Sequence, residues 1–341
     1  MASDWPKNGY NIASTFSGAG GSSFGYRIAG FNVQYANEFV ETAAKSYEAN
    51  MPSTFVDRRD IRLVKGSEIL EKCGGKVDVF DGSPPCQPFS TAGAGSRRWG
   101  VEKSYGDHSQ RADDLFDEYL RLVDEIQPKV FVAENVAGMT KGTAKGIFIQ
   151  VMQQLRKCGY QVEARLLDAS WLGTPQRRIR TIIVGVRDDL QRQPRFPDPL
   201  PYQYHICDAL PALSGADIWI GREQYRGVRR YPAAGLMPTI TLQGSCLVRH
   251  LQISLPPDSM TNEGWADPVP PVGWPKASEG HPGRRLMDIS EIKLLAGFPA
   301  DYTFDGTYIP QWERIGNSVP PPMACAIGKA VAGVLDNASV S

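Results

Sequence analysis

The stretch NIASTFSGAGGS, residues 11–22, decides the fold. The run Asn11–Phe16 predicts a short strand, and Ser22–Ala29 predicts the helix that follows it. Glycines between a strand and a helix let the backbone approach a ligand and expose the amides of the helix N-terminus. A nicotinamide dehydrogenase is one interpretation of this stretch taken alone. The dinucleotide fingerprint is incomplete, however, because Ser23 stands where its last glycine would be.

The alternation of strands and helices continues to about residue 187. Further strands are predicted at 32–37, 77–80, 130–133, 161–167 and 181–186, and helices at 41–50, 115–126 and 147–156. Strands that alternate with helices predict a mostly parallel, doubly wound sheet with ligands at the carboxyl ends of the strands. The fold class is therefore α/β and Rossmann-like.

The pattern changes near Gln193, where prolines and glycines become frequent and helical periodicity is lost as far as Gly283. Helices are predicted again at Ile289–Leu295 and at Pro320–Leu335. We therefore expect one catalytic, ligand-binding domain built from residues 1–192 and 284–341. Residues 193–283 are expected to form a small, irregular, β-rich domain inserted into it.

The overall charge is balanced, with 37 lysines and arginines against 37 aspartates and glutamates among 341 residues. Arginines nevertheless gather in Gly173–Arg195 and in Arg222–His250, which suggests a local patch for a polyanion. No apolar run is long enough to predict a membrane span. The segment Met1–Tyr10 is polar, so no secretory signal is predicted and a cytoplasmic location is expected.

Six cysteines are scattered along the chain without a CxxC pair, so neither a disulfide framework nor a metal site is expected. Cys86 differs from the others because it lies in GSPPCQPFS, residues 82–90, just after a predicted strand. Prolines on both sides stiffen the backbone around the thiol. Because a nucleophile needs a fixed line of attack, Cys86 is the candidate nucleophile.

Three further motifs carry chemistry. AENV at 133–136 places an acid at the end of an apolar strand, and QRRIR at 176–180 leads into another strand. In an extended segment, Arg178 and Arg180 would point to the same face. GNSVP at 316–320 precedes the last predicted helix. Each motif alone has a plain structural interpretation, such as a helix cap or a solvated basic edge.

Together and in this order, these motifs resemble the DNA (cytosine-5) methyltransferase family of prokaryotic or phage type. The segment 285–299 is also similar to the penultimate motif of that family, so the resemblance covers about residues 10–190 and 284–336. It implies a domain that binds S-adenosylmethionine, with S-adenosylhomocysteine as product. It also implies double-stranded DNA as the substrate, with the target cytosine flipped out of the duplex.

The resemblance implies a cofactor site at the strand ends. Phe16 and Phe39 would cover the two faces of the adenine, Glu38 would bind the ribose hydroxyls, and Asp60 would accept from the adenine amino group. The full set of expected cofactor-binding residues is Phe16, Gly18, Gly20, Glu38, Phe39, Asp60, Ile61, Pro85, Leu115, Asn317 and Ser318.

The implied chemistry uses Cys86, Glu134, Arg178 and Arg180. Attack of the Cys86 thiolate on carbon 6 of cytosine would make carbon 5 nucleophilic enough to accept a methyl group. Glu134 would hold the ring nitrogen and the exocyclic amine, where it stabilises developing charge and donates a proton. The two arginines would orient the base, and one would reach its carbonyl oxygen.

DNA contacts are expected in two regions. The long loop after Cys86 would close over DNA, with Arg97 or Arg98 on a phosphate or in a groove. PTIT at 238–241 resembles the threonine-containing element of the family's target-recognition region. The residues expected to bind DNA are Ser90, Arg97, Arg98, Arg226, Arg229, Arg230, Thr239 and Gln243. The DNA sequence recognised stays open, because direct readout depends on loop geometry.

Two alternatives remain at this point. An RNA cytosine-5 methyltransferase of the same architecture would use the same fold, although the Cys-Phe-Thr element associated with such relatives is absent. A non-catalytic nucleic-acid-binding relative would be marked by loss of Cys86 or Glu134, and both are present. A monomer is expected, and a cognate restriction endonuclease acting separately is a further expected partner.

Overall fold

The computed structural model describes residues 7–85, 103–105, 108–110, 114–142, 144–220, 229–240, 242–243, 246–247, 251–254 and 284–338. The chain divides into two compact units. The first comprises Met1–Asp168, Ile179–Pro199 and Ser318–Ser341, and the second comprises Ala169–Arg178 and Leu200–Asn317.

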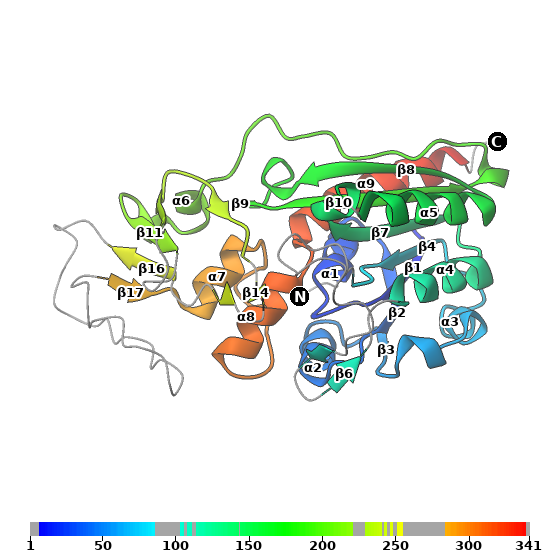
Figure 1. The fold of residues 1–341 in the computed structure, drawn as a ribbon, viewed down its shortest axis with the longest axis horizontal. Helices are drawn as coiled ribbons and strands as arrows, with labels where there is room; N and C mark the ends of the chain where they lie inside the picture. Colours follow the sequence, from blue (N-terminus) through cyan, green and yellow to red (C-terminus); the bar gives the residue numbers. More distant parts are fainter. Residues whose placement is uncertain are drawn as a thin grey trace. The chain divides into compact units, whose positions relative to one another are not determined.

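A seven-stranded sheet forms the centre of the first unit (Figure 1). Its strands are β1 (Asn11–Thr15), β2 (Asn32–Asn37), β3 (Phe55–Asp57), β4 (Val79–Gly82), β7 (Val130–Val136), β8 (Tyr160–Asp168) and β10 (Ile179–Arg187). Their order is β3-β2-β1-β4-β7-β10-β8, and only β10 runs antiparallel to its neighbours in this sheet. The expected mostly parallel, Rossmann-like α/β fold is therefore confirmed.

Helices cover both faces of this sheet. They are α1 (Gly21–Ile28), α2 (Glu41–Asn50), α3 (Gly66–Lys72), α4 (Leu115–Ile126), α5 (Ala144–Lys157) and α9 (Pro321–Ala338). Residues of α3, α4 and α5 join one apolar cluster with alternate strand residues such as Phe80 and Phe131. The next residue along β4, Asp81, points the other way, where Ser22 and Tyr26 of α1 donate to its carboxylate.

The last helix of the chain, α9, packs against the first, α1. Gly25 makes this approach possible, because a Cβ there would lie 2.4 Å from the Pro321 carbonyl oxygen and 2.6 Å from the Ala324 Cβ. One candidate membrane span by length and composition runs from Tyr308 to Asp336. Most of it is buried inside the protein, and it is broken between α8 (Tyr308–Asn317) and α9, as expected of core helices.

The second unit is rich in short strands. β12 (Arg229–Pro232), β11 (Asp217–Ile220), β16 (Leu251–Ser254) and β17 (Arg284–Leu286) form one antiparallel sheet in that order. β9 (Gln176–Arg177) pairs with β13 (Met237–Pro238), and β14 (Leu242–Gln243) pairs with β15 (Cys246–Leu247). The helices of this unit are α6 (Ile206–Ala209), α7 (Ile289–Leu295) and α8.

The boundaries of the two units differ from the boundary expected at 193–283. The second unit also takes in Ala169–Arg178 and the helical residues up to Asn317. Long-range bonds explain the difference: β9 pairs with β13, and the Gln176 amide donates to the Leu295 carbonyl oxygen at 3.5 Å. A distinct target-recognition domain therefore stays a prediction.

Candidate active site

The expected cofactor residues of the first unit follow the carboxyl ends of strands on one side of the point where the strand order reverses. β1 and β4 are neighbours, and the chain winds from them in opposite directions along the sheet. A doubly wound sheet binds ligands at this switch point, beyond the carboxyl ends of its strands. Phe16 follows β1, Glu38 follows β2, and Asp60 lies three residues past β3.

The glycine-rich loop adopts a left-handed backbone at Phe16 (φ 52°), Gly18 (φ 56°) and Gly20 (φ 92°). Glu38 holds this loop in place, because its Oε2 accepts from the Gly18 amide at 2.8 Å. Its Oε1 accepts from the Val40 amide at 2.8 Å, and the side chain is only 8% exposed. A non-glycine residue with positive φ is costly and is held by its surroundings, which is typical of a functional loop.

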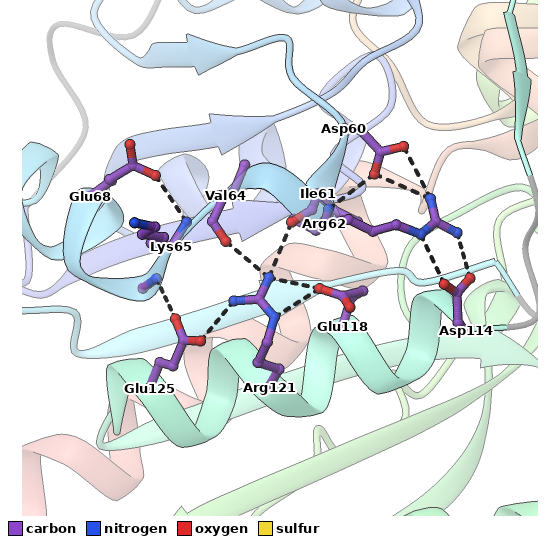
Figure 2. Close-up of polar contacts among 11 residues, drawn as sticks. Asp60, Ile61, Arg62, Val64, Lys65, Glu68, Asp114, Glu118, Arg121 and Glu125 are labelled. Carbon is purple, nitrogen blue, oxygen red and sulfur yellow. Dashed lines mark hydrogen bonds and ion pairs between the residues drawn. The ribbon is translucent and has the colours of Figure 1, made fainter.

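Asp60 caps the short turn Ile61–Leu63, with Oδ1 accepting from the Arg62 amide at 3.0 Å. The Arg62 guanidinium pairs with Asp60 at 3.0 Å and also with Asp114, the residue before α4 (Figure 2). Ile61 is buried, and so is Leu115, the first residue of α4. Asp60 is thus linked through Arg62 to the residue that precedes α4.

A buried carboxylate, Asp81, was not expected from the sequence. It accepts from Ser14 Oγ at 2.9 Å, from Ser22 Oγ at 3.0 Å and from the Tyr26 hydroxyl at 2.9 Å. Burial raises the pKa of Asp81 to about 6, against the lowering effect of these three hydrogen bonds. The sequence signal that could have revealed it is the presence of acids, Asp78 and Asp81, within the otherwise apolar segment VDVFDG at 77–82.

The segment that leads to Cys86 is tied to β7. The buried Asn135 amide donates to the Pro84 carbonyl oxygen at 3.1 Å. Gly82 allows the Tyr119 ring to approach, since a Cβ there would lie 2.5 Å from that ring. Pro85 is described, whereas Cys86 lies outside the described residues, as do Ser90, Arg97 and Arg98.

Glu134 and Arg180 meet across the antiparallel pair β7 and β10. Arg180 Nε lies 2.9 Å from Glu134 Oε1, and the side chains are 12% and 13% exposed respectively. The opposing positions in the two strands are Ile182 with Glu134 and Arg180 with Val136. The structure thus brings together two of the four expected catalytic residues.

Arg178 lies between β9 and β10 and belongs to the second unit. Its side chain is 3% exposed, and Nη1 donates to the carbonyl oxygens of Gly316 at 2.8 Å and Ile240 at 3.4 Å. Arg178 thus bonds two other segments of its own unit. The face that it was expected to share with Arg180 stays a prediction.

The remaining expected residues are divided between the units. Asn317 ends α8 and is exposed, and Ser318 is buried in the first unit. Thr239 Oγ1 donates to the Arg177 carbonyl oxygen at 2.5 Å. Arg229 and Arg230 lie in β12 and Gln243 lies in β14, whereas Arg226 is outside the described residues.

The residues at the strand ends suit a nucleoside cofactor. A Cβ at Gly18 would meet nothing within 4 Å, so there is open space beside the loop. Two carboxylates at the ends of adjacent strands can accept from ribose hydroxyls and from an amino group. Phe16 supplies an aromatic face. In the described part of the chain, no group of three or more His, Cys, Asp or Glu residues could hold a metal ion.

This fold and this site define an S-adenosylmethionine-dependent methyltransferase. The chain matches the model of the family described as C-5 cytosine-specific DNA methylase over residues 10–333, and it belongs to that family. It is therefore a DNA (cytosine-5) methyltransferase. The family match supports DNA over RNA as its substrate.

Named relatives span most of the chain. It is 31% identical to the Type II methyltransferase M.PspPI of Psychrobacter sp. (strain TA137), with 98% of this chain and 81% of that protein aligned. It is 30% identical to the Type II methyltransferase M1.HphI of Haemophilus parahaemolyticus, with 93% and 85% aligned. A crystal structure of a Spodoptera frugiperda DNMT2 mutant is similar with a TM-score of 0.64 at 18% identity, covering 97% of this chain and 99% of that one. At that identity the likeness shows the fold alone.

Proposed function

We propose that Cys86 is the nucleophile that attacks cytosine and that Glu134 and Arg180 hold the flipped base. One observation carries the proposal: two adjacent residues of β7 bond to the proposed base-binding arginine and to the segment that precedes Cys86. Glu134 pairs with Arg180 at 2.9 Å, and Asn135 holds Pro84 at 3.1 Å, two residues before Cys86. Strand β7 therefore carries the proposed base-binding acid and also holds the backbone two residues before Cys86.

In the reaction, the Cys86 thiolate adds to carbon 6 of cytosine, so that a carbon–sulfur bond forms and the ring loses its conjugation. Glu134, in its protonated form, donates its proton to the ring nitrogen as charge develops there, and it accepts a hydrogen bond from the exocyclic amine. The ring nitrogen loses this proton again when the thiolate leaves. Arg180 keeps the Glu134 carboxyl group aligned through the 2.9 Å contact and stabilises the carboxylate that remains after the proton transfer. After methylation, loss of the carbon 5 proton lets the ring electrons expel the thiolate and restores the free enzyme.

The cofactor is held by the strand ends of the first unit. S-adenosylmethionine supplies an electrophilic methyl group when it is bound. We assign the adenine to Phe16, Phe39, Asp60 and Ile61, and the ribose hydroxyls to Glu38. Gly18 and Gly20 leave room for the rest of the molecule, with Pro85, Leu115, Asn317 and Ser318 completing the set.

A trapping experiment tests the nucleophile. Duplex DNA with 5-fluorocytosine in many sequence contexts blocks the final proton loss, so an attacking cysteine stays bound to DNA. With S-adenosylmethionine present, the expected result is a covalent adduct that maps to Cys86 by mass spectrometry. Cys86→Ser should form none, whereas Cys158→Ser, which changes the cysteine just after α5, should form as much as the parent enzyme. An adduct on another residue would overturn the assignment.

The target-recognition role belongs to residues 193–283 in this proposal. The arginine excess of that region supports Arg226, Arg229 and Arg230 as DNA contacts, together with Thr239 and Gln243. In the segment after Cys86, Ser90, Arg97 and Arg98 are proposed to contact DNA. Alanine at positions 226, 229 and 230 should lower DNA affinity and reduce its salt dependence, by a slope of about 0.9 for each phosphate that is no longer neutralised. An unchanged slope would remove these arginines from the DNA interface.

The Type II relatives support a place in restriction–modification. We propose that the enzyme acts as a monomer in the cytoplasm of a bacterial or phage-infected cell, where its DNA substrate lies. A cognate endonuclease would act separately on the same site. The trapped 5-fluorocytosine DNA, once sequenced, gives that site. Protection of the site by methylation against an endonuclease of matching specificity is the test of the pairing.

A further inference from the structure

The turn that carries Asp60 is attached to α4 through Arg62 (Figure 2). Arg62 Nη1 donates to both oxygens of Asp60, at 3.2 Å and 3.0 Å. Its Nε donates to Asp114 Oδ2 at 2.9 Å, and its Nη2 donates to Asp114 Oδ1. A guanidinium that bonds a carboxylate through two nitrogens fixes direction as well as distance. Arg62 therefore links Asp60 rigidly to the residue that precedes α4.

Arg121 attaches the backbone of the same turn to α4. It lies on α4, and its Nη2 donates to the carbonyl oxygens of Ile61 at 3.2 Å and Val64 at 2.9 Å. One turn further along α4, Glu125 accepts from the Gly66 amide at 2.7 Å. The backbone after Asp60 is thus fixed to α4 at several points, and on this fixed backbone the Arg62 amide and the Arg62 guanidinium both donate to the Asp60 carboxylate.

We propose that Arg62 is a positioning residue for adenine recognition: it holds the Asp60 carboxylate so that it can accept from the adenine amino group. This inference rests on the proposed role of Asp60. An ionised carboxylate only accepts hydrogen bonds, so it suits an amino group and repels a carbonyl oxygen at the same position.

The geometry favours this role over a purely stabilising one. The Asp60 and Asp114 side chains are 35% and 50% exposed, and exposed ion pairs contribute little to folding. Orientation of a ligand-binding group does not depend on burial, because a small misplacement weakens a directional hydrogen bond.

The test compares two ligands that differ only at carbon 6 of the purine and at the neighbouring N1, which carries a hydrogen in the inosine ligand alone. S-adenosylhomocysteine carries the amino group at carbon 6, and S-inosylhomocysteine carries a carbonyl oxygen there. Calorimetric titration of the full-length enzyme should show that the parent protein prefers the adenosine ligand. Arg62→Ala should weaken adenosine binding by about tenfold while leaving inosine binding nearly unchanged, so the preference falls. Arg62→Lys, which keeps the charge without the bidentate geometry, should fall between the two.

Controls separate this role from general damage. Arg58→Ala removes an exposed arginine that pairs with Glu41 and Glu48, and it should leave both affinities unchanged. Asp114→Asn should reduce the preference, and adding it to Arg62→Ala should cause little further loss. Equal weakening of both ligands by Arg62→Ala would overturn the positioning role. A parent enzyme without any preference would refute the role of Asp60 itself, while the trapping of Cys86 would still report on the proposed reaction.

Discussion

Glu134 and Arg180 form a nearly buried ion pair, with Arg180 Nε 2.9 Å from Glu134 Oε1 across strands β7 and β10. Taking two charges out of water is unfavourable, so such a pair contributes little to stability compared with apolar residues of similar size. Removal of one partner, however, leaves a lone buried charge. A nearly buried ion pair at the carboxyl end of a parallel strand is better explained by a role in the reaction than by a contribution to stability.

Loss of the arginine should therefore impair the reaction rather than cofactor binding. Arg180→Met is expected to lower the rate of a single methylation turnover by about a hundredfold, the usual effect of removing one charge-stabilising donor. The affinity for S-adenosylhomocysteine should be unchanged. Arg165→Met is the matched control, since Arg165 pairs with Glu163 on the exposed surface of β8 at 2.8 Å. Full activity of Arg180→Met would remove this residue from the site.

The bond between Asn135 and Pro84 leads to a second prediction. Asn135→Ala removes the donor to the Pro84 carbonyl oxygen, so the segment before Cys86 loses one of its attachments. We expect covalent trapping on 5-fluorocytosine DNA to slow by about tenfold, because a displaced nucleophile reacts less often. Cofactor affinity, measured by calorimetry, should stay within about twofold of the parent value. A trapping rate equal to that of the parent would show that Pro84 is held by other contacts.

Local patterns made much of the fold predictable. The helix Leu115–Ile126 and the strand Asn32–Asn37 have the bounds that their apolar spacing indicates. Helix α8 was not predicted, because its sequence YIPQWERIGN has a proline at its third position and a glycine near its end. The candidate site depends less on local pattern and more on pairing between distant segments.

Arg178 and Arg180 illustrate that limit. The QRRIR motif does not indicate that β9 pairs with β13, about sixty residues further along the chain, or that Arg178 donates to the carbonyl oxygens of Ile240 and Gly316. No local pattern around residue 178 contains that pairing. The Asp81 cluster is similar, since its donors Ser14, Ser22 and Tyr26 come from β1 and α1 and meet Asp81 only in the folded unit.

Asp81 gives a prediction about pH. Burial raises the pKa of this carboxyl to about 6, above its ordinary value of 3.8, so the folded protein keeps a proton that the unfolded chain releases. Stability due to Asp81 is therefore greatest at low pH and is lost as pH rises through about 6. Between pH 5 and pH 8 the loss is about 1 kcal/mol in the free energy of unfolding.

Urea unfolding of the parent enzyme and of Asp81→Asn across this range isolates the effect, because the amide does not titrate. The difference in unfolding free energy between the two proteins should shift by about 1 kcal/mol in favour of the variant as pH rises from 5 to 8. A shift of the opposite sign would mean that the three hydrogen bonds to Asp81 outweigh its burial.

The contact between α1 and α9 gives the last prediction. A Cβ at Gly25 would lie 2.4 Å from the Pro321 carbonyl oxygen, and backbone cannot yield as a side-chain tip can. Gly25→Ala should therefore lower the free energy of unfolding by about 1–3 kcal/mol. Gly146→Ala, on an exposed part of α5 with nothing within 4 Å, should be neutral or slightly stabilising. If both variants unfold at the same urea concentration, the close approach of the first and last helices does not limit stability.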